Sequence, residues 1–158
     1  MSPLIFTLFF NMINPKDYQE TVYKIIGAAM TVHRELNWGL LESIYNEALH
    51  LELLDLGIKH ETEKHLPCYY KHHQLEKYFQ LDLVVDDDII VELKSVNKIM
   101  PAHRSQLFNY MRLTKKPIGL LINFGQPSLQ GERYAFFSES NACVVLDKEM
   151  DLVYPDDI

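Results

Sequence analysis

The sequence has few cysteines: Cys68 and Cys143 are the only two among its 158 residues. Their spacing is not that of a metal-binding motif, and a single pair does not form the disulfide framework of a small secreted domain. We therefore expect neither a thiolate metal site nor a disulfide scaffold. The default compartment for such a chain is the reducing cytoplasm.

The sequence also lacks a membrane-spanning run. The apolar segment at residues 3–13 is too short to cross a bilayer. No basic segment precedes it and no small-residue cleavage site follows, so we do not expect a signal peptide. We interpret residues 1–13 as an N-terminal extension from an upstream start codon, with Met12 as the alternative start. An N-terminal peptide beginning at Ser2 or Pro3 in proteomic data would contradict this hypothesis.

Positive charge is scarce as well. Lysine and arginine number 15 against 22 acidic residues, which gives a net charge of −7. This balance argues against a generic nucleic-acid coat protein, although it does not exclude a locally basic groove. With 47% hydrophobic residues and no linker, repeat or low-complexity tract, residues 14–158 are predicted to form one globular domain.

Residues 78–94 carry the strongest signal in the chain. Two runs rich in Val, Ile and Leu flank Asp86, Asp87 and Asp88, a pattern that predicts a β-hairpin. Strict alternation of side chains would place 78, 80, 82 and 84 on one face and 79, 81, 83 and 85 on the other. The second strand would then present Ile90, Glu92 and Lys94 together.

The length of the hairpin loop decides whether the charged residues meet. A three-residue loop pairs Val85 with Ile89 and therefore Asp82 with Glu92, whereas a two-residue loop places the carboxylates on opposite faces. We therefore predict an odd-length loop or a compensating bulge. Two acids and Lys94 would then lie close together on rigid strands.

This constellation suits phosphodiester chemistry. Paired carboxylates at an open position bind Mg²⁺, which keeps several waters and takes one or two protein carboxylates besides substrate phosphate. A neighbouring lysine can orient or activate the attacking water and offset charge on phosphorus. A solvated strand face with a cross-strand ion pair is the alternative interpretation, and on this motif alone it is the commoner one.

Two helices are predicted ahead of the hairpin. The first begins at Asn14-Pro15, where asparagine caps and proline starts a helix, and it buries a stripe through residue 36. His33 near its end is interpreted as a capping or packing residue. The second runs from about Leu41 to Leu56 and ends at Gly57. Its expected core residues are Ile44, Leu49, Leu53 and Leu56.

Glu42 stands at the start of that second helix and has two readings. It is either an acid that stabilises the positive end of the helix or a further metal ligand pointing toward the hairpin. Between the second helix and the hairpin, residues 58–63 and 66–72 are predicted to form two short strands around Pro67. A polar turn is expected at His72 and His73, which are poor joint metal ligands because neighbours on a strand face opposite ways.

Residues 94–116 contain no acid. This window carries cations suited to phosphate contacts, although a basic helix surface that balances acids elsewhere explains it equally well. A helix is expected from Pro101 to about Thr114, with His103, Gln106 and Tyr110 on one face and Leu107, Met111 and Leu113 as its apolar packing. The substrate-binding candidates in the window are Lys98, His103, Arg104 and Arg112.

The last part of the chain predicts the remaining sheet. Residues 117–124 form a short continuous apolar run, typical of a strand buried on both faces. A strand, a helix and then this strand indicate a right-handed βαβ crossover. Residues 125–131 are expected to form a loop, and further strands are expected at 134–137 and 142–146.

This order of elements resembles the PD-(D/E)XK nuclease superfamily, and within it the GxxExxY family. Gly39-Leu40-Leu41-Glu42-Ser43-Ile44-Tyr45 matches the name-giving motif, and Gln106 and Tyr110 resemble the Gln-x-x-x-Tyr motif of helicase–nuclease enzymes. The similarity extends from about Tyr23 to Gly125. It departs at Asn37-Trp38, where Gly-Pro is common, and at Arg104-Ser105. Its further segments are 32–36, 81–85, 90–96 and 119–125.

The resemblance implies an α/β fold: a restriction-endonuclease-like αβββαβ core with a mixed central sheet flanked by helices. It also implies that Asp82 and Glu92 bind Mg²⁺ or Mn²⁺, with the Leu93 carbonyl and Glu42 as further ligands. Lys94 would position or activate water, and Gln106 and Tyr110 would contact the scissile phosphate or support Lys94.

The leading hypothesis is thus a metal-dependent nuclease acting on DNA, in repair or in defence against foreign DNA, with no membrane partner and with homodimerisation as a way to cut both strands. The alternative is a catalytically silent nucleic-acid- or protein-binding module on the same fold. The net charge of −7 and the absence of an obvious added DNA-binding domain favour that alternative.

Overall fold

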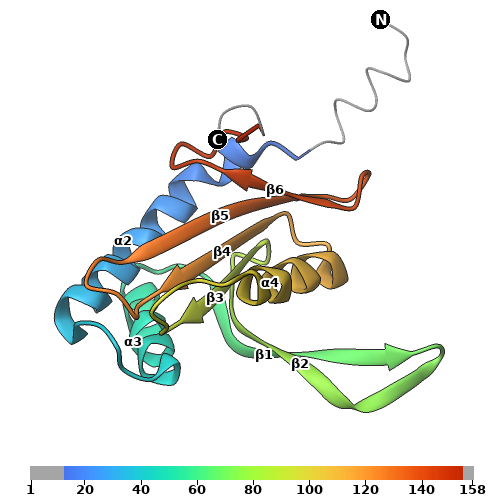
Figure 1. Cartoon of the computed structure of the whole chain (residues 1–158), viewed down its shortest axis with the longest axis horizontal. Coiled ribbons are helices and arrows are strands. Elements are labelled where there is room, and N and C mark those ends of the chain that lie inside the picture. The colour runs from blue at the N-terminus through green and yellow to red at the C-terminus, as the bar shows by residue number, and fades with distance from the viewer. Residues whose placement is uncertain (1–12, 155–158) are drawn as a thin grey trace, which may run out of the picture.

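The computed structural model describes residues 13–154 (Figure 1). The proposed extension and its alternative start at Met12 therefore fall outside the described residues, except for Ile13. The elements are η1 (Pro15–Tyr18), α2 (Gln19–Leu36), α3 (Glu42–Asp55), β1 (His60–Tyr70), β2 (His73–Val85), β3 (Ile89–Lys94), α4 (Pro101–Thr114), β4 (Ile118–Asn123), β5 (Gln130–Phe137) and β6 (Ala142–Leu146).

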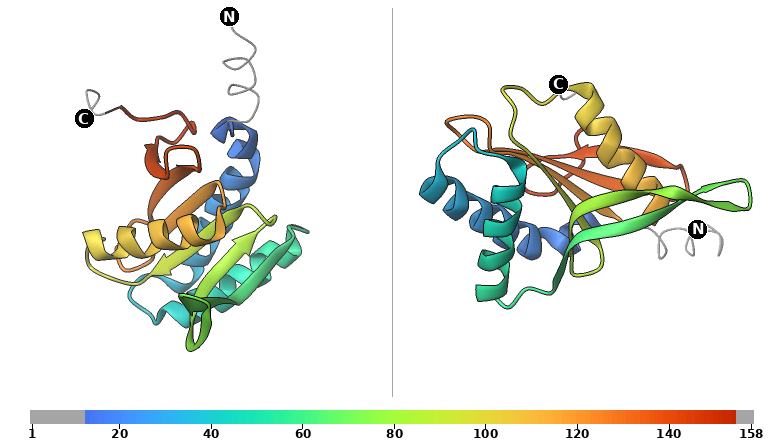
Figure 2. Two further views of the ribbon diagram at one scale, coloured as in Figure 1. Left: turned by 90° about the vertical axis from the view of Figure 1, so that its right-hand side faces the viewer. Right: turned by 90° about the horizontal axis from the view of Figure 1, so that it is seen from below.

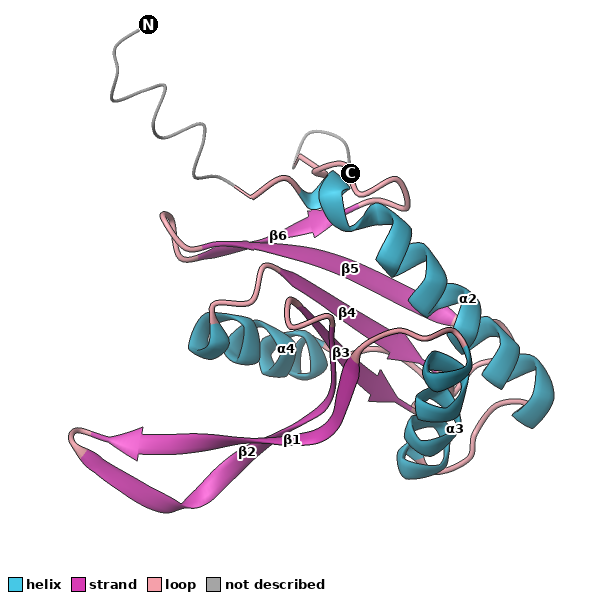
Figure 3. Cartoon of the chain, turned by 180° about the vertical axis from the view of Figure 1, so that it is seen from behind, coloured by secondary structure: helices cyan, strands magenta, loops and turns pink. Residues whose placement is uncertain are grey.

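A six-stranded mixed sheet forms the centre of the molecule. The strand order is β1-β2-β3-β4-β5-β6, with β3 and β4 parallel and every other neighbouring pair antiparallel. Helix α4 connects the two parallel strands, as the predicted crossover requires. Helices α2 and α3 lie on one face and α4 on the other (Figures 1 and 3). The predicted α/β fold class is confirmed.

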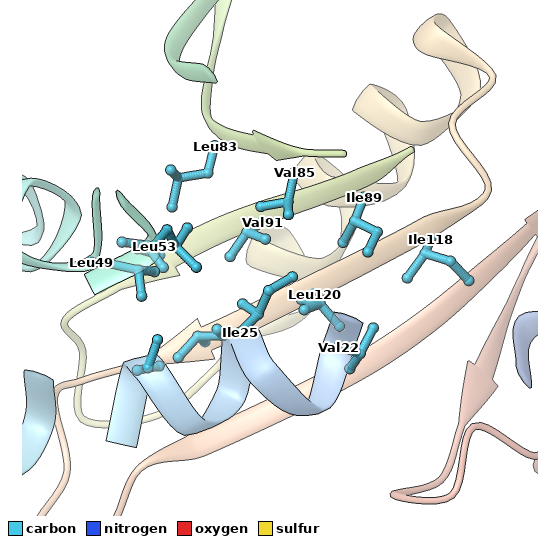
Figure 4. Close-up of a cluster of buried hydrophobic side chains, with 14 of the residues drawn as sticks. Val22, Ile25, Leu49, Leu53, Leu83, Val85, Ile89, Val91, Ile118 and Leu120 are labelled. Atoms are coloured by element: carbon cyan, nitrogen blue, oxygen red, sulfur yellow. The ribbon is translucent and has the colours of Figure 1, made fainter. Parts of the chain in front are cut away.

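Each face of the sheet has its own core. Helix α2 buries Val22, Ile25 and Ala29 in the larger core, which α3 completes with Leu49 and Leu53 (Figure 4). Side chains of β3 and β4 alternate between the two faces, so Val91 belongs to this core while Ile90 faces α4. The smaller core under α4 comprises Leu81, Val84, Ile90, Ile99, Leu107, Tyr110, Met111, Leu121, Tyr134 and Phe136.

Several predicted elements are confirmed. Asn14 caps the first turn, its side chain accepting from the Lys16 amide, although that turn is a 3₁₀ helix before α2 begins. Helix α4 has the predicted bounds. The hairpin pairs Val85 with Ile89, so the loop has the predicted odd length, although the regular register ends at Leu83 and Val91, one residue before Asp82 and Glu92. None of the helices within residues 13–154 is long and apolar enough to cross a bilayer.

The prediction of two short strands around Pro67 was wrong. Residues 60–70 form the single strand β1, and Pro67 is accommodated at a register shift between Pro67 and Tyr69. Because β1 is first in the strand order, only one side of it bonds to a neighbour, and a proline without an N–H group is tolerated there. Likewise β5 begins at Gln130, inside the expected loop.

The predicted faces also need correction. Ile44 and Leu56 of the second helical segment are exposed, whereas Tyr45 and Asn46 are buried, because the buried face of α3 is the one that carries these two residues together with the correctly predicted Leu49 and Leu53. Leu113 at the end of α4 is exposed as well. On β2, Leu81 packs under α4 but Leu83 packs on the opposite face, so strict alternation fails at Asp82.

Candidate active site

Asp82 and Glu92 lie where β2 separates from β3. The regular ladder between these strands covers only Leu83–Val85 and Ile89–Val91. Beyond Leu83 and Val91, backbone amides donate to carboxylates instead of to backbone carbonyls. The Asp82 amide donates to Glu92 Oε1 (3.2 Å), and the Leu93 amide donates to Asp82 Oδ2 (2.8 Å). Each carboxylate is thereby held by the strand opposite its own.

The two acids share a poorly solvated position. Glu92 is only 3% exposed, and burial together with the Asp82 charge raises the pKa of Glu92 to about 9. Burial is also the main cause that raises the pKa of Asp82, with the Glu42 charge adding to it. Two carboxylates that cannot both ionise at low cost create a position where a cation is electrostatically favourable.

Lys94 completes the group from the end of β3. Its Nζ donates to Gln106 Oε1 (2.8 Å), and Gln106 Nε2 donates to the Tyr110 hydroxyl (3.2 Å). Gln106 and Tyr110 are four residues apart on α4, so both point from the same helical face to the sheet. The Lys94–Gln106–Tyr110 chain therefore ties the ammonium group to a rigid helix.

Glu42 belongs to α3, which lies on the face of the sheet opposite α4 (Figure 3). It is the first residue of α3 and is exposed, and it affects Asp82 through its charge rather than through a hydrogen bond. An open hollow of about 690 Å³ lies beside it, lined by residues 39–44 and Ser95. No group of three or more His, Cys, Asp or Glu side chains with metal-binding geometry occurs within residues 13–154. The acids gathered at this position are thus the Asp82–Glu92 pair, with Glu42 near enough for its charge to raise the pKa of Asp82.

Two asparagines that support this site were not singled out from the sequence. Asn46, one turn after Glu42, is buried and its Nδ2 donates to the Asp82 carbonyl (3.5 Å), while its Oδ1 has no hydrogen-bond partner in the described structure. Asn123 is fully buried at the end of β4. A polar amide within an otherwise apolar helix face or strand is the signal that would have found them.

Asn123 fixes the chain directly after Lys94. Its Oδ1 accepts from the amides of Val96 (3.0 Å) and Gly125 (2.9 Å), and its Nδ2 donates to the Val96 carbonyl (2.9 Å). A Cβ atom at Gly125 would lie 2.2 Å from that carbonyl oxygen, so only glycine allows this close approach. The end of β3 therefore cannot shift without breaking this clamp.

The cations of the acid-free window do not form one stripe. Lys98 is exposed in the loop before α4, and His103 Nδ1 accepts from the Met100 amide at the start of that helix (2.9 Å). Arg112 Nη1 contacts Asn109 Oδ1 at 3.5 Å. Lys115 lies over the Phe136 ring, and Lys116 donates to the Asp87 carbonyl. Lys98 follows the end of β3 by four residues, and His103 lies in the first turn of α4.

Arg104 is engaged within the protein. Its Nε and Nη2 donate to the two oxygens of Glu132 (2.7 and 2.8 Å), and Glu132 in turn accepts from the Tyr134 hydroxyl (2.5 Å). The Arg104 guanidinium is the main cause that lowers the pKa of Glu132. This half-buried bidentate pair joins α4 to β5 and engages two of the three guanidinium nitrogens of Arg104.

We expect Arg104→Ala to destabilise the fold. The substitution leaves the Glu132 carboxylate without its bidentate partner, at a cost of about 1–2 kcal/mol. Because the pKa of Glu132 is lowered in the folded state, the lost contribution exists above its unfolded pKa and disappears as pH falls through the folded value. Thermal unfolding at neutral pH and near pH 3 measures this. An equal loss of stability at both pH values would contradict it.

Comparison with known proteins agrees with this geometry. A family model described as the PD-(D/E)XK nuclease superfamily matches residues 19–134, from the start of α2 into β5. Neither curated proteins nor solved structures yielded a match. The matched range includes both carboxylates, the lysine two residues after the second, and the α4 helix that holds it. The chain therefore belongs to the PD-(D/E)XK nuclease superfamily.

Proposed function

We propose that this protein is a metal-dependent nuclease that hydrolyses phosphodiester bonds in DNA. The observation that carries the proposal is the hydrogen-bonded Asp82–Glu92 pair where β2 separates from β3, with the Lys94 charge near enough to act on the pKa of both acids. Burial and the Asp82 charge raise the pKa of Glu92, and carboxyl groups with pKa values shifted in this way are concentrated at functional sites.

The donor set fits Mg²⁺ or Mn²⁺. Asp82 and Glu92 would hold the ion, with the Leu93 carbonyl as a further ligand and Glu42 adding a carboxylate from α3. Mg²⁺ usually takes one or two protein carboxylates and keeps several waters, so this small set and the hollow beside Glu42 are compatible with it. When bound, the ion would supply Lewis-acid stabilisation of the phosphate and lower the pKa of water.

The side chains around the carboxylates have separate tasks in hydrolysis. Lys94, held by Gln106, would orient the attacking water and stabilise negative charge on the phosphate oxygens. The Tyr110 hydroxyl accepts from Gln106 and keeps its proton free to donate toward the phosphate. The water oxygen forms a bond to phosphorus, the ester P–O bond breaks, and a water proton ends on the departing oxygen. The products are a phosphate monoester and a free hydroxyl.

We further propose membership of the GxxExxY family within the superfamily. The motif has a structural logic here: Gly39 has a positive φ of 85°, which glycine adopts readily. Tyr45 is fully buried, and its ring stacks on that of Phe124 with the ring centroids 4.4 Å apart. Its hydroxyl donates to the Asn37 carbonyl (2.7 Å) and accepts from the Leu40 amide (3.1 Å). The tyrosine thereby fixes the turn that presents Glu42.

Cleavage in defined metals tests the proposal. Purified protein should nick or degrade plasmid and linear DNA in Mg²⁺ or Mn²⁺ but not in EDTA, and Asp82→Asn should lower cleavage by about 10²-fold or more because a charged ligand is lost. Titration calorimetry of both proteins with Mn²⁺ should show binding that the variant loses. Cleavage in EDTA, or full cleavage by Asp82→Asn, would contradict the proposal.

The alternative function is a silent binding module on the nuclease fold. It predicts nucleic-acid or protein binding without cleavage in either metal, and the same assay distinguishes it. A role in DNA repair or defence against foreign DNA, and a homodimer that cuts both strands, extend the leading proposal. Gel filtration of the DNA-bound protein tests whether it is a homodimer.

A further inference from the structure

The outer part of the β1–β2 hairpin extends away from the rest of the sheet. We call residues Lys64–Tyr78 the arm. Strand β2 pairs with β3 only at Leu83–Val85, so within the arm β1 and β2 pair with each other alone. Figures 1 and 2 show this ribbon projecting past the helices. Every residue from Tyr69 to Tyr78 is exposed, so the arm contributes little to the cores.

The chemistry of the arm differs from that of the chain. It contains three lysines and one glutamate, a net charge of +2 in a protein whose net charge is −7. Neither Lys71 nor Lys77 forms a salt bridge with a described acid; Lys71 lies over the Tyr70 ring instead. Tyr69, Tyr70 and Tyr78 are 60%, 62% and 55% exposed. Exposed tyrosines among unpaired cations suit phosphates and bases rather than an apolar partner.

The arm leads directly to the candidate active site. Tyr78 precedes Asp82 by four residues on the same strand, which is about 13 Å at the rise of a β-strand. The turn at Lys71 and His72 lies about ten residues from Asp82, or roughly 33 Å along the strand. That length equals about ten base pairs of duplex. A two-stranded ribbon also has the width that a DNA major groove admits.

We propose that the arm is a nucleic-acid-binding element that contacts the phosphate backbone of the strand held in the site. This inference rests on the proposed function for the identity of the strand at Asp82. Lys71 and Lys77 would bind phosphates, and Tyr70 would pack on a sugar or base. The arm thus provides the local positive charge that the overall composition of the protein lacks.

Pairing of the β1 edge with a second copy is the competing use of this ribbon. Pro67 on the edge strand and the register shift beside it disfavour continuous pairing. The positive charge would also face an identical positive charge, which opposes self-association. Both features favour nucleic acid as the occupant.

Binding by full-length protein in EDTA tests the arm without cleavage. The variant is Tyr70→Ser/Lys71→Ala/Lys77→Ala, and the control is Lys24→Ala/Lys148→Ala, which removes two exposed lysines from α2 and the segment after β6. The probes are a fluorescein-labelled 30-base-pair duplex and its single strand. We expect the Kd of at least one probe to rise about tenfold or more for the arm variant. For this variant, the slope of the logarithm of the binding constant against the logarithm of salt concentration should become less negative by about 1.8 for the duplex or about 1.4 for the single strand, because two phosphate contacts are lost.

Three outcomes would overturn the proposal: Kd values for both probes within twofold of wild type, an equal loss in the control, or a change of oligomeric state without a change in Kd. Cleavage kinetics separate this result from the proposed function. If the wild-type enzyme cuts DNA and the arm variant has a raised KM with less than a twofold fall in kcat, the nuclease function and the binding role of the arm are both supported. Active enzyme with an unchanged KM overturns the arm alone. DNA binding that depends on the arm, in a protein that never cleaves, overturns the nuclease alone.

Discussion

Lys94→Ala should lower the kcat for DNA cleavage by about 10²- to 10³-fold while metal binding and DNA affinity change little. The estimate follows from the loss of one fixed electrostatic donor at a reacting centre. The ammonium group is held by Gln106 from α4 rather than by either carboxylate, so its removal leaves the Asp82–Glu92 pair intact. A loss confined to kcat would identify Lys94 as a catalytic residue.

The control is Gln106→Ala, which keeps the ammonium group but removes its anchor. We expect a smaller loss of kcat, about tenfold, because Lys94 then samples other rotamers. Single-turnover cleavage in Mg²⁺ and calorimetry with Mn²⁺ measure chemistry and metal binding separately. Cleavage by Lys94→Ala at the wild-type rate would mean that the activity belongs to a contaminant or that another residue orients the water.

Glu92→Gln should stabilise the metal-free protein at alkaline pH and abolish cleavage. Folding raises the pKa of Glu92 to about 9 from its ordinary value near 4.5. The contribution of the protonated carboxyl to stability is therefore complete below about pH 4.5 and is lost as pH rises through 9. The neutral amide does not ionise, so the variant should lack this decline. The pKa of Asp82 is raised in the wild type, which strengthens the same trend.

A buried charge without a partner costs about 3–5 kcal/mol when it cannot relax. Even a partial cost of about 2 kcal/mol moves the Tm of a chain of this size by about 4–8 °C. We expect a difference of that order between Glu92→Gln and wild type at pH 8.5 in EDTA, and a smaller one at pH 5. Added Mg²⁺ should raise the Tm of the wild type but not that of the variant, since only the wild type keeps the charged ligand.

Glu132→Gln is the matched control for charge removal. Arg104 lowers the pKa of Glu132, so this variant should be less stable than wild type at neutral pH, the opposite sign. Differential scanning calorimetry across pH 5 to 9 measures all three proteins. If wild-type stability does not fall with rising pH in EDTA, folding does not raise the pKa values of Asp82 and Glu92, and the electrostatic argument for a cation at this pair is wrong.

The local structure was largely readable from the sequence. Proline at 101, the 3.6-residue periodicity of α2 and the apolar run of β4 each depend on interactions within one segment or on simple burial. The odd-length loop at 86–88 was predicted on the premise that Asp82 and Glu92 share a face, and the pairing of Val85 with Ile89 confirms that loop length. Failures occurred where a neighbouring element decides the outcome, as with Pro67, which is acceptable only because β1 is an edge strand.

The site shows the same division. Asp82, Glu92, Lys94, Gln106 and Tyr110 were all identifiable from spacing and resemblance, and the structure brings their side chains together. Asn46 and Asn123 were not, because their value lies in hydrogen bonds to segments far away in the chain. The bidentate pair of Arg104 with Glu132 was not predicted either, because the two residues are 28 positions apart; Arg104 as a substrate contact stays a prediction.

The amino-acid order alone determined the helices, the hairpin, the buried strand β4 and the chemical types at the site, because periodicity, capping and apolar runs are local properties of the chain. Only the folded arrangement decided which charges are free, which are paired and which are buried, since desolvation and pairing depend on neighbours remote in sequence. The separation of β2 from β3 at Asp82 is the clearest case. The backbone pairing ends there, the carboxylates of Asp82 and Glu92 accept hydrogen bonds from the opposite strands, and the arm extends into solvent.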